Sequence, residues 1–332
     1  MKKIFKLSLM LVLVFNLTSC KLSQLQIGVT TYPVSYLVSR IAQDRVSIVD
    51  LSQGPTMTRA QIVDNYDQLL DQLDVAFVFG KLEPYLSIYA QDFQDHSVPM
   101  VDLTASASVY LFERYQVTDV QGTRVTLESP YYNSPLFDRV DTYQTDPYLW
   151  LDPITTISMA GTIKDWLIQH YPEEKAFFEE NYATLALELA RMDADYQELW
   201  KQTIGFVSVT PSFGNWQKAF GVSVYPLILS RYGVLPTEEQ LQFILNEVKA
   251  AGIQYIVHEP NLSEDMEALY NRVKDELKLK PVEMHSLAFL TEADGAANKN
   301  YMTLMWENLD TLEGMTPLVV EEPVSPETTT KP

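Results

Sequence analysis

Few residues in this 332-residue chain are suited to covalent or metal chemistry, because it has one cysteine and four histidines. The cysteine is Cys20, and the histidines are His96, His170, His258 and His285. The sequence has no Gly-x-Ser-x-Gly turn, phosphate loop, His-Glu-x-x-His motif or catalytic-cysteine motif. The neighbours His258 and Glu259 would point to opposite faces of a strand. We therefore expect a binding protein rather than an enzyme.

Cys20 stands at the end of a short N-terminal leader. Three of the first six residues are lysines, and residues 7–17 are mostly apolar. This run is too short to span a bilayer comfortably. Because it ends in small residues and a cysteine, it resembles a bacterial lipoprotein signal, in which the thiol takes a diacylglycerol. We expect a signal peptide over residues 1–19, a lipid anchor at Cys20 and an exported protein on the outer membrane face. The alternative is an ordinary cleaved signal beside an incidental cysteine.

The composition after the leader is typical of an exported globular protein. No second long apolar segment is present, and the lack of further cysteines excludes disulfides and thiolate metal sites. The roughly 310 remaining residues suffice for two domains with their own cores. Over the whole chain, acidic residues outnumber basic ones by 44 to 24, and three of the basic residues are the leader lysines. This excess of acid disfavours binding to nucleic acid or anionic lipid.

Short apolar runs alternate with amphipathic stretches, the pattern of βα units around a parallel sheet. Strands are expected at 26–30, 46–51, 75–79 and 100–103, and again at 205–209, 222–225, 253–258 and 281–284. Helices are expected at about 34–43, 62–72, 83–92, 237–250, 263–277 and 298–312. The predicted fold class is α/β, with two Rossmann-like lobes built on central parallel sheets.

A long periodic segment at 173–203 separates the two halves. Its apolar residues recur at spacings of four and three, and Gly205 follows its end. A continuous helix of this length would measure about 45 Å. We expect it to join an N-terminal lobe (20–172) rigidly to a C-terminal lobe (204–315); the alternative is a core helix of one lobe. The periodic residues are Phe178, Tyr182, Leu185, Leu189, Met192, Tyr196 and Leu199.

Two segments lack a clear pattern. Residues 105–145 read as irregular, with β-rich pieces at 109–112 and 124–127 around a turn at Gln121-Gly122. Residues 316–332 are rich in proline, threonine and acids, so we expect a disordered tail.

Five short motifs cover most of the mature chain. They are Thr30-Thr31-Tyr32-Pro33; Leu73 to Leu86 around Gly80; Asp146-Pro147-Tyr148-Leu149-Trp150-Leu151-Asp152-Pro153; Pro236-Thr237 through Glu259-Pro260; and Tyr301, Met305, Asn308 and Leu309. Their order resembles that of the zinc- and manganese-binding lipoproteins that serve ABC importers, the cluster 9 (A-I) solute-binding proteins. The resemblance implies two lobes with one cation in the cleft between them.

The cation ligands of that family, histidines and carboxylates, are largely exchanged here. The matching positions hold Met57 or Thr58, Tyr148, Thr210 and His285, with Glu259 nearby. Thioether, neutral phenol and hydroxyl groups bind zinc or manganese weakly. His285 and Glu259 are therefore our metal-ligand candidates, no cofactor is certain, and Zn²⁺ or Mn²⁺ stays open. Met57 with His285 would instead suit monovalent copper.

The aromatic residues near these positions allow two interpretations. Tyr32, Tyr148, Trp150 and Trp216 either line a pocket for an organic ligand or fill the interface between the lobes.

Two functions remain open. The first is a solute-binding lipoprotein, with a degenerate metal site, that delivers zinc, manganese or another small ligand to an ABC permease. The second is a surface accessory or adhesion lipoprotein that no longer binds metal or binds a different small ligand. A cleft filled by its own side chains favours the second, and a roomy polar pocket there favours the first with a changed ligand. In both cases we expect a lipid-anchored monomer that does not bind nucleic acid.

Overall fold

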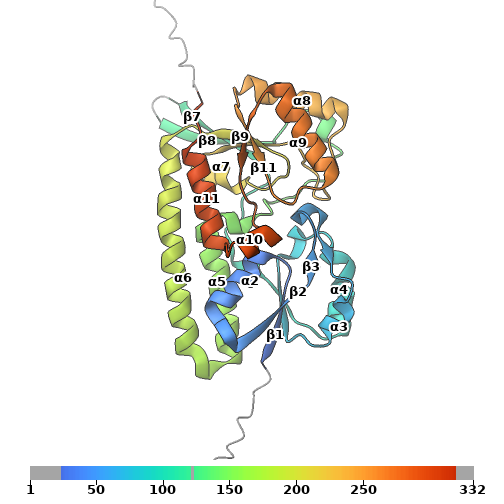
Figure 1. Cartoon of the computed structure of the whole chain (residues 1–332), viewed down its shortest axis with the longest axis vertical. Coiled ribbons are helices and arrows are strands. Elements are labelled where there is room, and N and C mark those ends of the chain that lie inside the picture. Colours follow the sequence, from blue (N-terminus) through green and yellow to red (C-terminus); the bar gives the residue numbers. More distant parts are fainter. Residues whose placement is uncertain (1–23, 121–122, 319–332) are drawn as a thin grey trace, which may run out of the picture.

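The computed structural model describes residues 24–120 and 123–318, which form two α/β lobes stacked along the long axis of the molecule (Figure 1). The lower lobe contains a four-stranded parallel sheet in the order β2-β1-β5-β6. All four residues of β5 are buried, as expected for a parallel sheet covered on both faces. The sheet comprises β1 (Leu25–Val29), β2 (Val46–Asp50), β5 (Val75–Val78) and β6 (Met100–Asp102), with helices α2 (Tyr32–Ala42), α3 (Tyr66–Leu70) and α4 (Leu86–Asp95).

The upper lobe repeats this plan with a parallel sheet in the order β10-β9-β11-β12. Its strands are β9 (Gly205–Ser208), β10 (Ser223–Pro226), β11 (Tyr255–His258) and β12 (Lys280–Glu283). Its helices are α7 (Asn215–Phe220), α8 (Glu238–Ala250), α9 (Glu264–Leu277), α10 (Glu292–Ala296) and α11 (Tyr301–Glu313). Thr237 and Gln240 form a capping box that fixes the start of α8. The predicted strands are confirmed in both lobes. The helix expected at 62–72 was mostly wrong, because only the short α3 forms there.

The connecting helix α6 (Lys175–Tyr196) runs beside both lobes (Figure 1). Near its start, Asn181 donates a hydrogen bond of 2.9 Å to the carbonyl of Ile41 in the lower lobe. At its end, the buried hydroxyl of Tyr196 donates a bond of 2.7 Å to the carbonyl of Met305 in the upper lobe. The expected long connecting helix is therefore confirmed, and these two bonds tie it to both lobes. Its α-helical part is shorter than expected because turns of 3₁₀ helix occupy Pro172–Glu174 and Gln197–Lys201.

Helix α5 (Pro153–His170) packs beside α6 and was not expected from the sequence. The carboxylate of Asp152 caps its first turn by accepting hydrogen bonds from Ile154 N–H and Thr155 N–H, at 2.9 and 3.3 Å. Pro153 occupies the first helical position, where its missing N–H has no cost.

The segment predicted to be irregular contains a hairpin of β7 (Arg114–Val120) and β8 (Thr123–Ser129). The piece at 124–127 lies in β8, whereas 109–112 forms only an isolated bridge between Leu111 and Thr145. A second hairpin joins β3 (Ser52–Gln53) to β4 (Gln61–Ile62).

Several sequence-based predictions lie outside the described residues. These are the leader 1–19, the anchor Cys20, the turn at Gln121-Gly122 and the tail from 319 onward. Just before that tail, Leu318 N–H donates a 2.7 Å hydrogen bond to the Thr203 carbonyl. Among the described helices, none combines the length and the apolar character needed to cross a membrane.

The buried stripe of α6 predicts a position-specific loss of stability. Leu189 is fully buried, whereas Leu187 on the same helix is 53% exposed. Leu189→Ala should lower the free energy of unfolding by about 2–5 kcal/mol through lost burial and a residual cavity. The matched control Leu187→Ala should change it by less than about 0.5 kcal/mol. Urea unfolding followed by circular dichroism measures both. Equal effects would contradict the packing described for α6.

Candidate functional site at the interlobe seam

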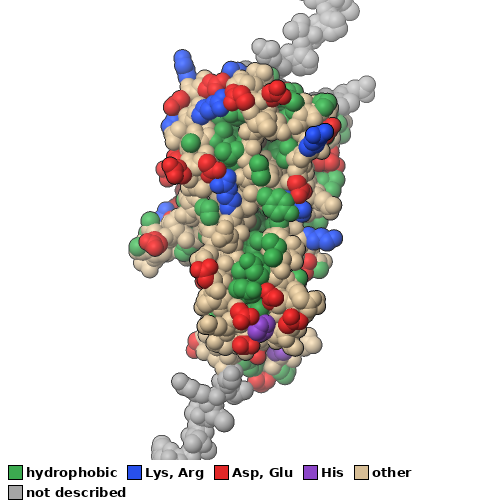
Figure 2. Space-filling view, turned by 90° about the vertical axis from the view of Figure 1, so that its right-hand side faces the viewer, with side chains coloured by type: hydrophobic (Ala, Val, Ile, Leu, Met, Phe, Trp, Pro, Cys, Tyr) green, Lys and Arg blue, Asp and Glu red, His purple; other side chains and the backbone are tan. Residues whose placement is uncertain are grey.

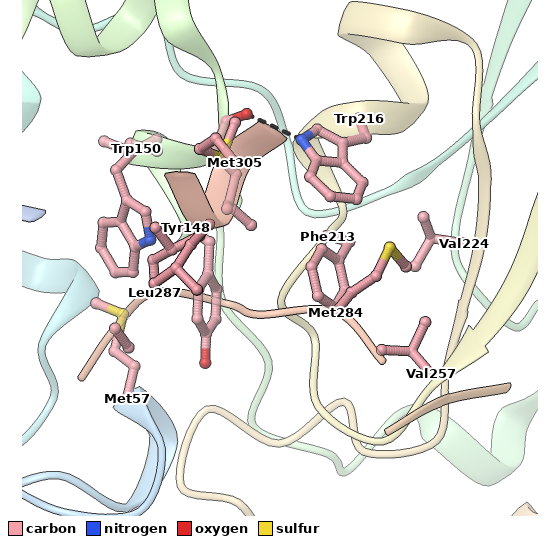
Figure 3. Close-up of a cluster of buried hydrophobic side chains, with 14 of the residues drawn as sticks. Met57, Tyr148, Trp150, Phe213, Trp216, Val224, Val257, Met284, Leu287 and Met305 are labelled. Atoms are coloured by element: carbon pink, nitrogen blue, oxygen red, sulfur yellow. Dashed lines mark hydrogen bonds between the residues drawn. The ribbon is translucent and has the colours of Figure 1, made fainter. Parts of the chain in front are cut away.

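Met57, Tyr148, Thr210, Ser212 and Glu259 lie in the interior between the two lobes; we call this set the interlobe seam. Met57 begins the 3₁₀ turn Met57–Arg59 of the lower lobe, and Thr210 follows β9 of the upper lobe. In Figure 3 the ring of Tyr148 lies between Met57 and the cluster that contains Phe213 and Met284. Met57 is 1% exposed, and Tyr148 and Thr210 are fully buried. Three of the expected positions, Met57, Tyr148 and Thr210, therefore meet in a closed interior.

The carboxylate of Glu259 is saturated by hydrogen bonds from the upper lobe. Oε1 accepts from Thr210 N–H at 3.1 Å, and the Thr210 hydroxyl lies 3.0 and 2.8 Å from the two carboxylate oxygens. Oε2 also accepts from the Ser212 hydroxyl at 2.6 Å. Burial raises the pKa of Glu259, and the bonds from Ser212 and Thr210 lower it in part. Ser212 was missed in the sequence, although it stands two residues after Thr210.

Tyr148 presents a neutral phenol to this network. Burial raises its pKa well above the usual value, the charge of Glu259 raises it further, and the hydroxyls of Ser212 and Thr210 lower it in part. Within the described residues, its own hydroxyl makes no hydrogen bond of regular geometry. A phenol that keeps its proton is a weak metal ligand.

His285 belongs to a different network, beside α10 and α11. Its Nδ1 accepts a 2.8 Å hydrogen bond from Leu287 N–H, and its Nε2 lies 3.2 Å from Asp294 Oδ2. Burial lowers its pKa, so the ring is neutral and its proton is on Nε2, facing the carboxylate. Both ring nitrogens are thus engaged, and none of their partners is Glu259. Across residues 24–120 and 123–318, no three His, Cys, Asp or Glu side chains are arranged to hold a metal.

The remaining candidate residues also have partners of their own. The hydroxyls of Thr58 and Thr56 lie 3.0 Å apart. Trp150 and Trp216 are fully buried, and their indole N–H groups donate to the carbonyls of Ser286 and Leu151 at 2.8 and 2.9 Å. These two indoles and Tyr148 fill the interior rather than line a pocket.

An ion pair across the seam was also missed in the sequence. Arg59 of the lower lobe donates to both carboxylate oxygens of Asp265 in the upper lobe, each at 2.7 Å. It also donates to the Ser263 hydroxyl at 2.9 Å and to the Gly233 carbonyl at 2.8 Å. This bidentate contact holds the lobes together two residues from Met57.

The side chain of Asp146 is a buried acid that accepts one hydrogen bond from the part of the chain that the structure describes. It is 2% exposed and accepts from Tyr148 N–H at 3.1 Å. A side chain at Gly214 would collide with its carboxylate, so the glycine makes room for it. Burial raises the pKa of Asp146 to about 8, against the lowering effect of the bond from Tyr148.

The raised pKa of Asp146 predicts that the free energy of unfolding falls as the pH rises. Between its ordinary pKa near 4 and the raised value of about 8, the folded protein holds a proton that the unfolded chain has lost. Asp146→Asn keeps the acceptor for Tyr148 N–H and should flatten this dependence in urea unfolding from pH 5 to 9. Asp64→Asn, at an exposed position, should keep the wild-type slope. An unchanged slope in Asp146→Asn would refute the assignment.

The Arg59–Asp265 pair predicts a measurable coupling between the lobes. Because Asp265 is 45% exposed, we expect about 1 kcal/mol from a double-mutant cycle of Arg59→Gln and Asp265→Asn at low salt. Hydrogen bonds from Arg59 and Ser263 hold the pKa of Asp265 well below its usual range. The coupling should therefore persist at neutral pH and decline only below about pH 4. If the effects of the two single substitutions on the free energy of unfolding simply add, the pair does not join the lobes.

Comparison with known proteins places this architecture among metal-binding proteins. The chain matches the family model ZnuA, "Zinc-uptake complex component A periplasmic", over residues 27–315. It is 30% identical over 192 residues to the zinc-binding protein AdcA of Streptococcus pyogenes serotype M3, covering 56% of this chain and 36% of that protein. It is 30% identical over 176 residues to the zinc-binding lipoprotein AdcA of Streptococcus pneumoniae serotype 4, covering 52% and 34%. The matched region thus spans about a third of these relatives.

Solved structures share the fold. Zn(II)-bound AdcA from Streptococcus pneumoniae aligns with a TM-score of 0.66 and 22% identity, covering 93% of this chain and 62% of that one. TroA, the periplasmic zinc-binding protein of Treponema pallidum, gives 0.67 and 16%, covering 87% and 98%. The laminin binding protein Lmb of Streptococcus agalactiae, described as having adhesin and metal-transporting activity, gives 0.68 and 17%, covering 87% and 98%. Because the family model spans most of its length, this chain belongs to the ZnuA family of metal-binding periplasmic solute-binding proteins.

Proposed function

We propose that this chain is an extracytoplasmic solute-binding lipoprotein of an ABC importer in which the family's zinc or manganese position has been lost. Family membership supports the solute-binding role. The leader and Cys20 support a lipid anchor on the outer membrane face.

The observation that carries this proposal is the donor chemistry of the interlobe seam. Zinc and manganese favour imidazole and carboxylate ligands, whereas Met57, Tyr148 and Thr210 offer a thioether, a neutral phenol and a hydroxyl. The carboxylate of Glu259 accepts hydrogen bonds from Thr210 and Ser212. A cation would have to displace these bonds inside an interior that excludes water, so these residues do not fit either metal.

The closure of the lobes gives a second argument. A cation held between two lobes would couple its binding to their closure. Here Arg59 binds Asp265 across the seam, and Met57 and Tyr148 fill the space beside it. Contacts between the chain's own groups therefore support the closed arrangement, including a backbone hydrogen bond of 3.0 Å from Tyr32 N–H to the Ala288 carbonyl.

A second candidate function is a surface accessory or adhesive role. The filled seam favours it, because a protein that carries no cation has no use for an open cleft. The structural similarity to Lmb, described as an adhesin as well as a metal transporter, also supports it. The two candidates differ in whether the mature protein binds a small solute and passes it to a permease.

Metal titration tests the loss of the cation site. Calorimetry and thermal melts of the chelator-treated mature protein should show neither binding heat nor stabilisation at micromolar zinc or manganese. The triple substitution Met57→His, Tyr148→His and Thr210→His should restore zinc binding, because it returns three imidazoles to the matching positions. A parallel variant with Thr58→His in place of Met57→His shows which residue matches the family's first histidine. Wild-type saturation by one zinc per chain would contradict the proposal.

Lipidation is tested separately at Cys20. Cys20→Ala should move the protein from the membrane fraction to the medium or periplasm and abolish incorporation of labelled palmitate, because the acylated thiol is lost. Cys20→Ser is the isosteric control and should behave in the same way. Retention of either variant in the membrane fraction with unchanged labelling would disprove the anchor.

A further inference from the structure

A large cavity opens on the molecular surface, and none of the five residues of the interlobe seam lines it. Its volume is about 920 Å³, in the range of small organic-molecule sites and far larger than a metal ion needs. The lower lobe contributes the ends of β5 and β6 and the start of α4, and the upper lobe contributes Arg231 and Tyr232. Ligands of open parallel sheets commonly bind at such carboxyl ends of strands.

Two acidic residues, the buried Glu83 and the exposed Asp102, line this cavity. Glu83 is 1% exposed, and its carboxylate accepts from Phe79 N–H at 2.6 Å and from the Tyr85 hydroxyl at 3.1 Å. Burial, with a smaller contribution from the nearby charge of Asp102, raises the pKa of Glu83 to about 7, against the lowering effect of the hydrogen bonds to its carboxylate. Asp102 also lines the cavity and lies against Gly80, which has a positive φ of 50°. An ammonium group placed here would relieve the repulsion between the two carboxylates.

The two basic side chains that line the cavity differ in whether they form an ion pair. Arg231 is neutralised by Asp141 at 3.1 Å, and its guanidinium lies over the ring of Tyr232. Lys81 is exposed at the rim and has no ion pair within the described residues. The cavity therefore presents both signs of charge.

A second, mainly apolar cavity of about 330 Å³ adjoins the first. Both are lined by Asp141 and by Tyr232, which is 50% exposed. The second cavity is walled by Leu227, Leu229, Val234 and Leu235, and Arg139 stands at its edge. Among the residues the structure describes, Arg139 has no hydrogen-bond or ion-pair partner. Figure 2 looks onto the side that carries α3 and α4 in Figure 1, and hydrophobic side chains gather there in a column crossing both lobes.

We infer that the two cavities form one elongated site for a short peptide with free termini. The ammonium of the peptide pairs with the exposed carboxylate of Asp102, beside the buried Glu83. The body of the peptide crosses Tyr232, an apolar side chain enters the second cavity, and the peptide carboxylate pairs with Arg139. The peptide would be the transported solute only if the proposed function holds. Its binding to the isolated protein is a separate claim.

The test is calorimetry of the mature protein with the peptides Leu-Ala-Leu, Leu-Ala-Ala-Leu and Leu-Ala-Ala-Ala-Leu. At least one length should bind. N-acetylation or C-amidation of that peptide should each weaken binding about tenfold or more, the effect of losing a charge-assisted hydrogen bond. Asp102→Asn should make binding insensitive to N-acetylation, and Arg139→Gln should make it insensitive to C-amidation.

Control variants keep the test specific. Asp64→Asn and Arg191→Gln change the same charges at exposed positions outside both cavities and should bind as the wild type does. Absence of binding by all three peptides, equal binding of the blocked peptides, or equal affinity for free leucine would overturn the inference. Loss of carboxylate recognition in Lys81→Gln rather than in Arg139→Gln would overturn the assigned orientation. None of these outcomes bears on zinc binding, so failure here and failure of the proposed function are distinguishable.

Discussion

The burial of one carboxylate constrains the rest of the interlobe seam. Glu259 is almost fully removed from water, and an ionised carboxylate without partners would be very costly there. Thr210 and Ser212 supply hydrogen bonds from its own lobe. Because Thr210 and Ser212 satisfy the hydrogen-bonding capacity of this carboxylate, Met57 and Tyr148 can fill the remaining space between the lobes. A metal ion entering the same space would have to undo each of these contacts.

The two lobes keep this interior closed because they are joined at several independent places. Helix α6 is bound to the lower lobe through Asn181 and to the upper lobe through Tyr196. Arg59 and Asp265 add an ion pair across the seam. These contacts join the lobes around the seam, whereas the two cavities lined by Tyr232 open on the molecular surface.

The regular elements could be predicted because their signals are local. Apolar runs bounded by turn residues revealed the strands of both sheets, and spacings of three and four revealed α6, α8 and α9. Helix α5 was not predicted because its buried face includes Thr155 and Thr156 beside Met159 and Ile163. These polar residues interrupt the apolar periodicity by which a helix is recognised in a sequence.

For the candidate site, the sequence predicted several of the residues that take part but not which side chains would pair with one another. The motif order identified Tyr148 and Thr210, but no local pattern indicates that Arg59 would meet Asp265, 206 residues away. The orientation of His285 toward Asp294 depends likewise on the placement of α10. The pairing of buried polar groups is decided by tertiary packing, so no sequence pattern indicates that Glu259 and His285 stand in separate networks.

The central claim is that the interlobe seam holds side chains where the family holds a cation. Crystals of the mature protein grown with zinc, with anomalous diffraction measured on both sides of the zinc absorption edge, test it most directly. The account predicts no anomalous peak among Met57, Tyr148, Thr210 and Glu259. A peak there with donor atoms within about 2.0–2.3 Å would contradict it.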